Sequence, residues 1–268
     1  MTVKKKQTQK PQLSQRRPPS FWGSAGKPIA IAHRGGDGAG NDKENTLEAF
    51  QAAWQAGYKY AETDVIKAAS GELIVIHGSH NFLQAGMKKD ITRRTLQKMT
   101  LAQIRGTLKP GGAKVPTLEE VLTAFPDMKL LLDLKTDETV APLAKLITRL
   151  KAFDRISVVG FDYARNLKFS KACRPARVSV GLTVGRGVRV KNINMLLLKT
   201  GRLSGVDAIL MHHSLVSRPM VNLVHRRGLK AVVWTANSKL GIKHAIRSGA
   251  DGVISDRIKL LKEVLNNN

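Results

Sequence analysis

Short apolar runs alternate along the chain with longer segments whose apolar residues recur at helical spacing, from residue 28 to the C-terminal region. Short β-branched runs of this kind predict buried strands, and the longer segments predict amphipathic helices. The predicted strands are 28–33, 59–66, 130–135, 156–161, 177–184, 207–212, 230–236 and 251–256. Eight buried strands, most of them followed by a helix, predict an α/β fold of the (β/α)8 or TIM-barrel type. A doubly wound open sheet shows the same alternation and is the structural alternative.

One stretch leaves no room for a helix between strands. After the strand at 59–66 the chain continues as KAASGELIVIH, which ends at residue 77. Ser70-Gly71 has the composition of a turn, so we predict a hairpin in which residues 72–77 return beside the second strand. If the turn is centred on Ser70-Gly71, Asp64 and His77 face each other across the hairpin, about 5 Å apart.

Polar residues interrupt the ends of several predicted strands. In a barrel of parallel strands all the carboxyl ends lie on one face, so these residues are expected to converge on a common mouth. Glu62 and Asp64 are two positions apart on one strand and therefore point to the same side. The converging residues are His33, Arg34, Glu62, Asp64, His77, Asp133, Lys135, Trp234 and Asn237.

The chemistry of these residues divides into three roles. The three carboxylates, Glu62, Asp64 and Asp133, form a hard-oxygen set suited to Mg²⁺ or Ca²⁺, and without a cation they would repel one another. Arg34 and Lys135 supply fixed positive charge for a phosphate. His33 and His77 can exchange protons near neutral pH. Together these groups predict a site that cleaves phosphodiesters.

Several sequence blocks resemble the glycerophosphodiester phosphodiesterase family. They are AHRGG, ENTLEAFQAAWQAGYKYAETDV, SGELIVIHGS, LLLDLK, VVGFD, VVWTAN and GADGVISD. The resemblance covers roughly residues 28–265, and the combination of spaced blocks is highly specific.

The resemblance implies a role for each residue at the mouth. His33 and His77 would form the acid/base pair, and Arg34 and Lys135 would hold the phosphate. Glu62, Asp64 and Asp133 would bind the divalent metal, Mg²⁺ or Ca²⁺. Trp234 would form a wall of the pocket, and Glu44 would cap and tether the first helix near the site.

Four features depart from the family pattern. Asp133 stands where the family has glutamate, and Gly78 follows His77 where the family has aspartate. The Leu-x-Arg-Thr-Thr run is absent, although Thr92, Arg93 and Thr95 partly replace it. A glycine- and acid-rich insertion precedes Glu44 and is expected to be a surface loop, with a lid as the alternative. His80 is expected to be a loop histidine without a role.

The excess of basic over acidic residues favours anionic binding partners. Forty-five Lys and Arg against 20 Asp and Glu give a formal net charge of +25 among 268 residues, which favours anionic partners. Residues 1–20 carry six basic side chains and no acid, and we predict a disordered basic tail over 1–24 and a barrel domain over 25–268. The tail offers peripheral association with an anionic membrane. The single cysteine, Cys173, fits a reducing compartment, and we expect a cytoplasmic protein that makes at most this peripheral contact.

The expected function is metal-dependent hydrolysis of glycerophosphodiesters to glycerol 3-phosphate and an alcohol, within lipid and glycerol metabolism. One alternative is a lysophospholipase D or sphingomyelinase D type of activity on a membrane lipid, and the substrate is accordingly a small glycerophosphodiester or a lysophospholipid. A second alternative is a catalytically weakened protein that binds anionic lipid or RNA. Aromatic residues make up only 5%, which disfavours a nucleic-acid partner.

Overall fold

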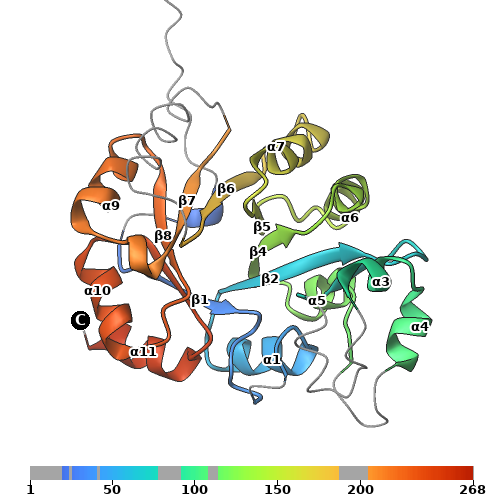
Figure 1. The fold of residues 1–268 in the computed structure, drawn as a ribbon, viewed down its shortest axis with the longest axis horizontal. Helices are drawn as coiled ribbons and strands as arrows, with labels where there is room; N and C mark the ends of the chain where they lie inside the picture. The colour runs from blue at the N-terminus through green and yellow to red at the C-terminus, as the bar shows by residue number, and fades with distance from the viewer. Residues whose placement is uncertain are drawn as a thin grey trace, which may run out of the picture.

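The protein is described by a computed structural model that covers residues 20–23, 26–40, 43–77, 92–107, 114–186 and 205–267. Within these ranges eight parallel strands follow the order β1-β9-β8-β7-β6-β5-β4-β2, and β1 pairs with β2 to close the barrel (Figure 1). A ninth strand, β3, runs antiparallel to β2. The strands are β1 Ile29–His33, β2 Tyr60–Lys67, β3 Leu73–Val75, β4 Lys129–Leu134, β5 Ile156–Val159, β6 Ser179–Val184, β7 Ala208–His212, β8 Lys230–Trp234 and β9 Gly252–Ser255.

The described helices lie outside the barrel and follow most of its strands (Figure 1). The α-helices are α1 Leu47–Gln55, α3 Arg93–Gln97, α4 Leu101–Gly106, α5 Leu118–Ala124, α6 Val140–Arg149, α7 Tyr163–Ala172, α9 Arg218–His225, α10 Lys239–Arg247 and α11 Ile258–Asn266. Three 3₁₀ turns are η1 Ser20–Trp22, η2 Asp137–Thr139 and η3 His213–Leu215. The predicted TIM barrel is confirmed, and all eight predicted parallel strands are present. The open sheet is excluded by the pairing of β1 with β2.

The predicted hairpin forms, but its register differs by one residue from the prediction. Val65 pairs with Val75, and the Ile76 amide donates to the Asp64 carbonyl at 3.0 Å, so Asp64 lies opposite Ile76 and not His77. The Ala68 amide bonds to the Glu72 carbonyl, which leaves a three-residue loop. Gly71 provides its left-handed position with φ of 106°, as such loops require. The expectation of a turn centred between Ser70 and Gly71 was therefore wrong.

The interior of the barrel is closed at the amino ends of its strands by η1. Phe21 and Trp22 are fully buried and pack with Ile31, Leu131 and other inward-facing residues. The Trp22 indole donates to the Ser179 hydroxyl at 2.9 Å. These two aromatic residues fall within the segment that the sequence analysis assigned to the tail. Residues 1–19 lie outside the described ranges, and their predicted disorder stays a prediction.

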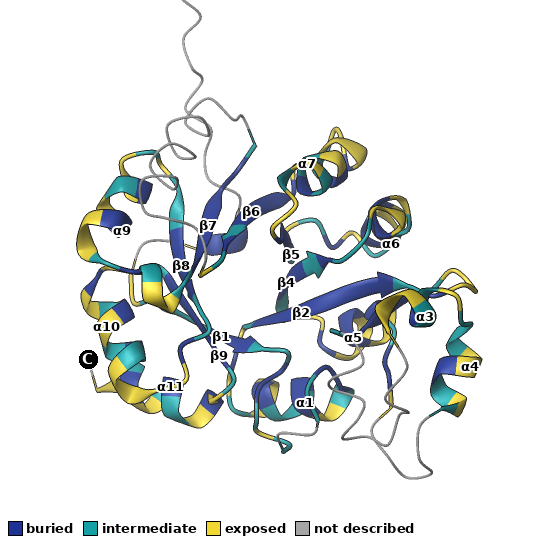
Figure 2. Cartoon of the chain, viewed as in Figure 1, coloured by how far each residue is buried: buried dark blue, intermediate teal, exposed yellow. Residues whose placement is uncertain are grey.

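A second and larger core lies between the barrel and its helices. Outward-facing strand residues such as Leu132 and Val253 meet the buried faces of the helices, and the solvent-facing sides of the same helices are exposed (Figure 2). A helix that buries one stripe against a sheet needs only that stripe to be apolar. No helix in the described ranges is both long and apolar enough to cross a membrane.

Candidate active site

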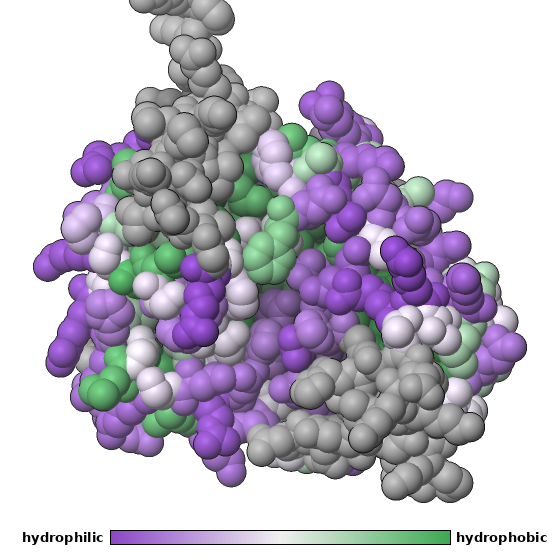
Figure 3. Space-filling model, viewed as in Figure 1, coloured by the Kyte–Doolittle hydropathy of each residue, from purple (hydrophilic) through white to green (hydrophobic). Residues whose placement is uncertain are grey.

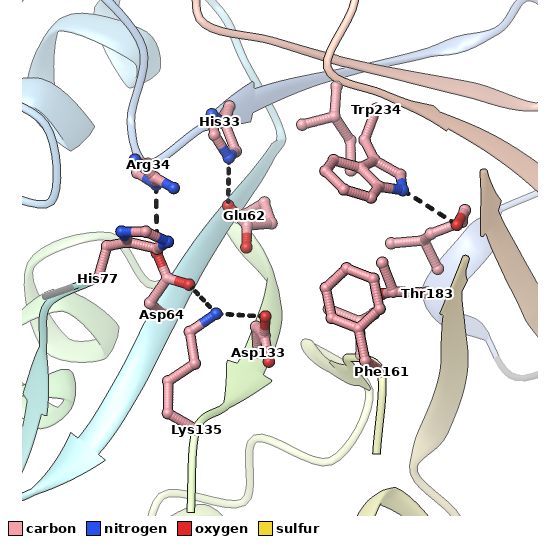
Figure 4. A pocket seen from close by; sticks show the side chains of 13 residues that line it. His33, Arg34, Glu62, Asp64, His77, Asp133, Lys135, Phe161, Thr183 and Trp234 are labelled. Atoms are coloured by element: carbon pink, nitrogen blue, oxygen red, sulfur yellow. Dashed lines mark hydrogen bonds and ion pairs between the residues drawn. The ribbon is translucent and has the colours of Figure 1, made fainter. Parts of the chain in front are cut away.

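A pocket opens at the carboxyl ends of the strands, and it is lined by eight of the nine residues expected at the mouth, all except Asn237 (Figure 4). They are His33, Arg34, Glu62, Asp64, His77, Asp133, Lys135 and Trp234. The pocket volume is about 100 Å³. This is below the roughly 300–1,000 Å³ of sites that enclose drug-sized ligands, so the pocket accommodates only part of a larger substrate.

Strand alternation explains why these residues meet. Ile31 and Leu131 belong to the barrel interior, whereas Ala32 and Leu132 pack on the outer helices. Positions two residues farther along each strand face inward again, and there the chain places His33 and Asp133. The inward positions near the strand ends therefore form the polar layer of the barrel.

The turn after β1 places Arg34 at the pocket and allows α1 to pack closely. Arg34, Gly35 and Gly36 all have positive φ, at 53°, 85° and 78°. A Cβ on Gly35 would lie 2.8 Å from the Ala49 Cβ, and one on Gly36 would lie 2.2 Å from Ile258 Cγ2. Side chains at these two positions would clash with α1 and α11, which accounts for the glycines after His33 and Arg34.

Two carboxylates orient the Arg34 guanidinium. Its Nη1 donates to Glu44 Oε2 at 3.0 Å, and its Nε forms an ion pair with Asp64 Oδ2 at 3.2 Å. Glu44 therefore tethers Arg34, while the first helix is capped by Thr46, whose hydroxyl accepts from the Ala49 amide at 3.2 Å. The capping role expected for Glu44 belongs to Thr46.

His33 is held from both ring nitrogens. Its Nδ1 is hydrogen-bonded to Asp256, and its Nε2 lies 3.6 Å from Glu62 Oε2. Burial favours the neutral ring, but the hydrogen bond to Asp256 and the charge of Glu62 outweigh it, so the pKa of His33 is raised. The protonated form of His33 is therefore favoured relative to that of an ordinary histidine.

Asp256 is a site residue that the sequence analysis did not identify. It follows β9, and the Asn237 side chain both donates to its carboxylate and accepts from its backbone amide at 2.9 Å. These bonds fix the carboxylate that contacts His33. The signal available in the sequence was an acid one residue after a buried strand, the position that Arg34 has after β1.

Glu62 is buried and incompletely paired. Its Oε2 has no hydrogen-bond partner among the described residues. Burial and repulsion from Asp64 raise the pKa of Glu62 to about 7. A buried oxygen of this kind indicates that a ligand is needed to complete the local charge balance.

Lys135 lies between the other two carboxylates. Its ammonium is 2.5 Å from Asp64 Oδ1 and also pairs with Asp133 (Figure 4). Lys135 and Arg34 outweigh the burial of Asp64 and lower its pKa. Burial raises the pKa of Asp133 despite its pairing with Lys135.

The three carboxylates proposed as metal ligands thus share the pocket. Within the described ranges, however, no group of three or more His, Cys, Asp or Glu side chains is arranged to hold a metal ion. The convergence predicted from the sequence is present, and the ligand role of Glu62, Asp64 and Asp133 stays a prediction.

His77 has an environment opposite to that of His33. Burial lowers the pKa of His77 to about 4, and the charges of Arg34, Lys135 and Arg93 act in the same direction against Asp64. Arg93 also donates to the His77 carbonyl at 3.2 Å from the start of α3. His77 is therefore neutral at neutral pH. Gly78 and His80, which the sequence analysis singled out, lie outside the described residues.

The opposite wall of the pocket is mainly apolar. The Phe161 ring stacks edge-on against Trp234 with centroids 5.8 Å apart, and the Trp234 indole donates to the Leu210 carbonyl at 3.1 Å. The remaining residues of this wall are Val159, Thr183 and Ile254. Phe161 was not singled out from the sequence, and 59% of its surface is exposed at the mouth.

The mouth of this (β/α)8 barrel holds two cations and two histidines whose pKa values are displaced in opposite directions. These features indicate a phosphodiester hydrolase. The sequence profile of the glycerophosphoryl diester phosphodiesterase family matches residues 33–260. The chain belongs to this family.

Relatives and solved structures agree with this assignment. The chain is 28% identical over 240 residues to the glycerophosphodiester phosphodiesterase of Caldanaerobacter subterraneus, covering 86% of this chain and 94% of that protein. It is 25% identical over 272 residues to lysophospholipase D GDPD1 of Mus musculus, covering 88% and 86%.

A solved structure shares the fold. It is an Oleispira antarctica phosphodiesterase in complex with the product sn-glycerol-3-phosphate, with a TM-score of 0.70 and 22% identity. The match covers 90% of this chain and 97% of that chain.

Proposed function

We propose that this protein hydrolyses a glycerophosphodiester to glycerol 3-phosphate and an alcohol. The observation that carries the proposal is the pair of histidines, whose pKa values are displaced in opposite directions within one pocket. Two titratable groups separated in this way are suited to act as an acid and a base at the same pH. Arg34 and Lys135 provide the charge that attracts the phosphate between them.

The proton transfers follow from these protonation states. Neutral His77 accepts the proton of the attacking hydroxyl. If water attacks, glycerol 3-phosphate forms directly. If the substrate's own glycerol hydroxyl attacks, a cyclic phosphate forms, and water then opens it with the two histidines in reversed roles. Protonated His33 donates its proton to the oxygen of the leaving alcohol as the phosphorus–oxygen bond breaks. Asp256 accepts from His33 Nδ1–H, so the proton at Nε2 is the one directed toward the pocket.

A divalent cation, Mg²⁺ or Ca²⁺, belongs to the same proposal. Glu62, Asp64 and Asp133 would hold it, and the Glu62 oxygen that lacks a hydrogen bond fits a hard cation. When bound, the ion would neutralise charge on the phosphate oxygens. Lys135 pairs with two of these carboxylates, so it would be released toward the phosphate as the ion binds.

A lysophospholipid is a second candidate substrate. The exposed Phe161 and the apolar wall behind it favour a substrate with an apolar portion near the mouth. Relatives named lysophospholipase D accompany those named glycerophosphodiester phosphodiesterase. The shallow pocket would hold the phosphate and leave an acyl chain outside.

A cytoplasmic location is part of the same proposal. The only cysteine of the chain, Cys173, is a free and buried thiol, as is common in a reducing compartment. Cell fractionation of the tagged full-length chain would test it, and recovery in an extracellular fraction would contradict it.

The deciding experiment measures turnover of glycerophosphocholine and of a lysophosphatidylcholine by the full chain, with Mg²⁺, Ca²⁺ or EDTA. Metal-dependent release of choline, lost in both His33→Ala and His77→Ala, would support the proposal, and the better substrate would decide between the two candidates. A folded protein that turns over neither substrate with either metal would overturn it in favour of a binding protein.

A further inference from the structure

Three consecutive helices begin with cations where a helix normally favours acids. Arg218 is the first residue of α9, Lys239 is the first of α10, and Lys259 is the second of α11, which is preceded by Arg257. None of these three helices has an acid in its first turn. The amino end of a helix carries partial positive charge, so cations there are unfavourable for the helix itself.

Two other helices of the barrel, α1 and α5, follow the usual preference. Glu48 lies in the first turn of α1, and Glu119 and Glu120 lie in the first turn of α5. Arg93 and Arg94 likewise begin α3, so α9, α10 and α11 are distinguished by following three neighbouring strands of the barrel. Helix stability does not account for their cations, because each acts against the dipole of its own helix.

The first turns of α9, α10 and α11 lie on the same face as the pocket. Each helix follows the carboxyl end of its strand, and β7, β8 and β9 are neighbours in the barrel. We call Arg218, Lys239, Leu240, Arg257 and Lys259 the basic rim. The helices that carry it lie together on the left of Figure 1, where hydrophilic side chains in Figure 3 are interspersed with smaller hydrophobic patches.

Leu240 lies within this basic rim with its side chain in solvent. It is 81% exposed, the highest value among the exposed large apolar residues of the described ranges. Phe161, also at the mouth, is 59% exposed. An exposed leucine surrounded by cations does not contribute to the core of this fold. It matches the interface of an anionic bilayer, where charged headgroups cover an apolar interior.

We propose that the basic rim docks the mouth of the barrel onto an anionic phospholipid bilayer, with Leu240 inserted between headgroups and the cations on lipid phosphates. The amino ends of α9, α10 and α11 would add their partial positive charge to the same anions. The Lys239 ammonium pairs with Glu263 at 3.3 Å, and the Arg257 guanidinium pairs with Asp37 at 3.4 Å. Surface ion pairs of this kind are weak, so both cations can leave their carboxylates for lipid phosphates. Leu240 has no ring on which a base stacks, so the basic rim fits a bilayer better than RNA.

The test compares two double charge-reversal variants of the full-length chain. One changes the amino ends of these helices, and the other changes their carboxyl ends. Arg218→Glu/Lys259→Glu changes the basic rim, and both side chains are exposed there. Arg226→Glu/Arg247→Glu, at the far ends of α9 and α10, is the matched control. Acids at the amino ends favour those helices, so the rim variant is expected to fold at least as well as the wild type.

Binding is measured by co-sedimentation with vesicles of phosphatidylcholine alone or mixed in equal parts with phosphatidylglycerol. The wild type is expected to bind only the anionic vesicles, and the rim variant is expected to bind them about tenfold or more weakly. The control should stay within about threefold of the wild type. Because binding is read without turnover, the result is independent of the proposed activity.

Insertion is tested separately. An environment-sensitive dye on Leu240→Cys should shift to the blue with anionic vesicles, whereas the same dye on Arg226→Cys should not. Equal vesicle binding by both charge variants would assign the affinity to the basic tail and overturn the proposal. Binding of single-stranded RNA that requires the basic rim, without vesicle binding, would also overturn it.

Discussion

The pocket wall built by β1, β2 and β4 holds its side chains in ion pairs, whereas the wall built by β5 to β9 holds an aromatic pair over aliphatic residues. On the first wall, Arg34 and Lys135 are each fixed by two carboxylates. On the second, Phe161 contacts Trp234 and is 59% exposed. The charged wall is thereby preorganised for one anion, and the apolar wall is adaptable. The comparison predicts that the charged wall governs the chemistry and that the apolar wall governs the choice of substrate.

The largest expected effect comes from removing the acid of the charged wall. His33→Ala should lower kcat for glycerophosphocholine by about 10³-fold, because general acid catalysis is lost. Phe161→Ala, on the opposite wall, is the matched control and should retain kcat. Thermal unfolding curves of both variants check the fold. Turnover of His33→Ala within a few fold of the wild type would refute the proposed role.

Metal removal should have the next largest effect. EDTA is expected to lower activity by about 10²-fold, and Mg²⁺ or Ca²⁺ should restore it, because three carboxylates otherwise face the anionic substrate. Glu62→Gln should raise the metal concentration needed for half-maximal activity. Glu44→Gln, which alters a carboxylate paired with Arg34, should not. Full activity in EDTA would exclude the proposed cation.

Asp256→Asn should lower kcat by about tenfold and shift its pH dependence. The hydrogen bond to Asp256 raises the pKa of His33, so its loss lowers that pKa. The acid form of His33 is then lost at lower pH, and the alkaline limb of the kcat profile should move to lower pH. A lower kcat with an unmoved alkaline limb would indicate that Asp256 has a purely structural role.

The smallest expected effect lies on the apolar wall. Phe161→Ala should raise KM for a lysophospholipid by a few fold, because an apolar contact at this exposed position contributes roughly 1 kcal/mol. Its kcat should not change, and KM for glycerophosphocholine should change less. Phe161→Leu keeps an apolar side chain and should recover part of the loss. Equal effects on both substrates would remove the distinction between the walls.

Sequence patterns predicted the local parts of the site well. The alternation in β2 placed Glu62 and Asp64 on one side of the strand, and both line the pocket. The hairpin was predicted correctly, but its register was predicted wrongly, because the same sequence is compatible with a loop of two or of three residues. Only the pairing of Ala68 with Glu72 shows which loop forms.

The contacts of His33 were outside the reach of sequence reasoning. Asp256 and Asn237 follow the last two barrel strands. Asn237 bonds to Asp256, and Asp256 meets His33 only because β9 pairs with β1. The burial of Phe21 and Trp22 likewise depends on an open end of the barrel for these side chains to fill. Barrel closure is a property of all the strands together, so no local pattern encodes it.

The amino-acid sequence by itself determined the alternation of strands and helices, the residue types at the strand ends and the family to which the chain belongs. Periodicity and residue chemistry are local properties, so they can be read directly from the sequence. The tertiary structure decided which carboxylate pairs with which cation, which histidine retains its proton and which helix ends share a face with the pocket. Those outcomes depend on burial and on distances of a few ångströms between residues far apart in the chain, which arise only when the barrel closes.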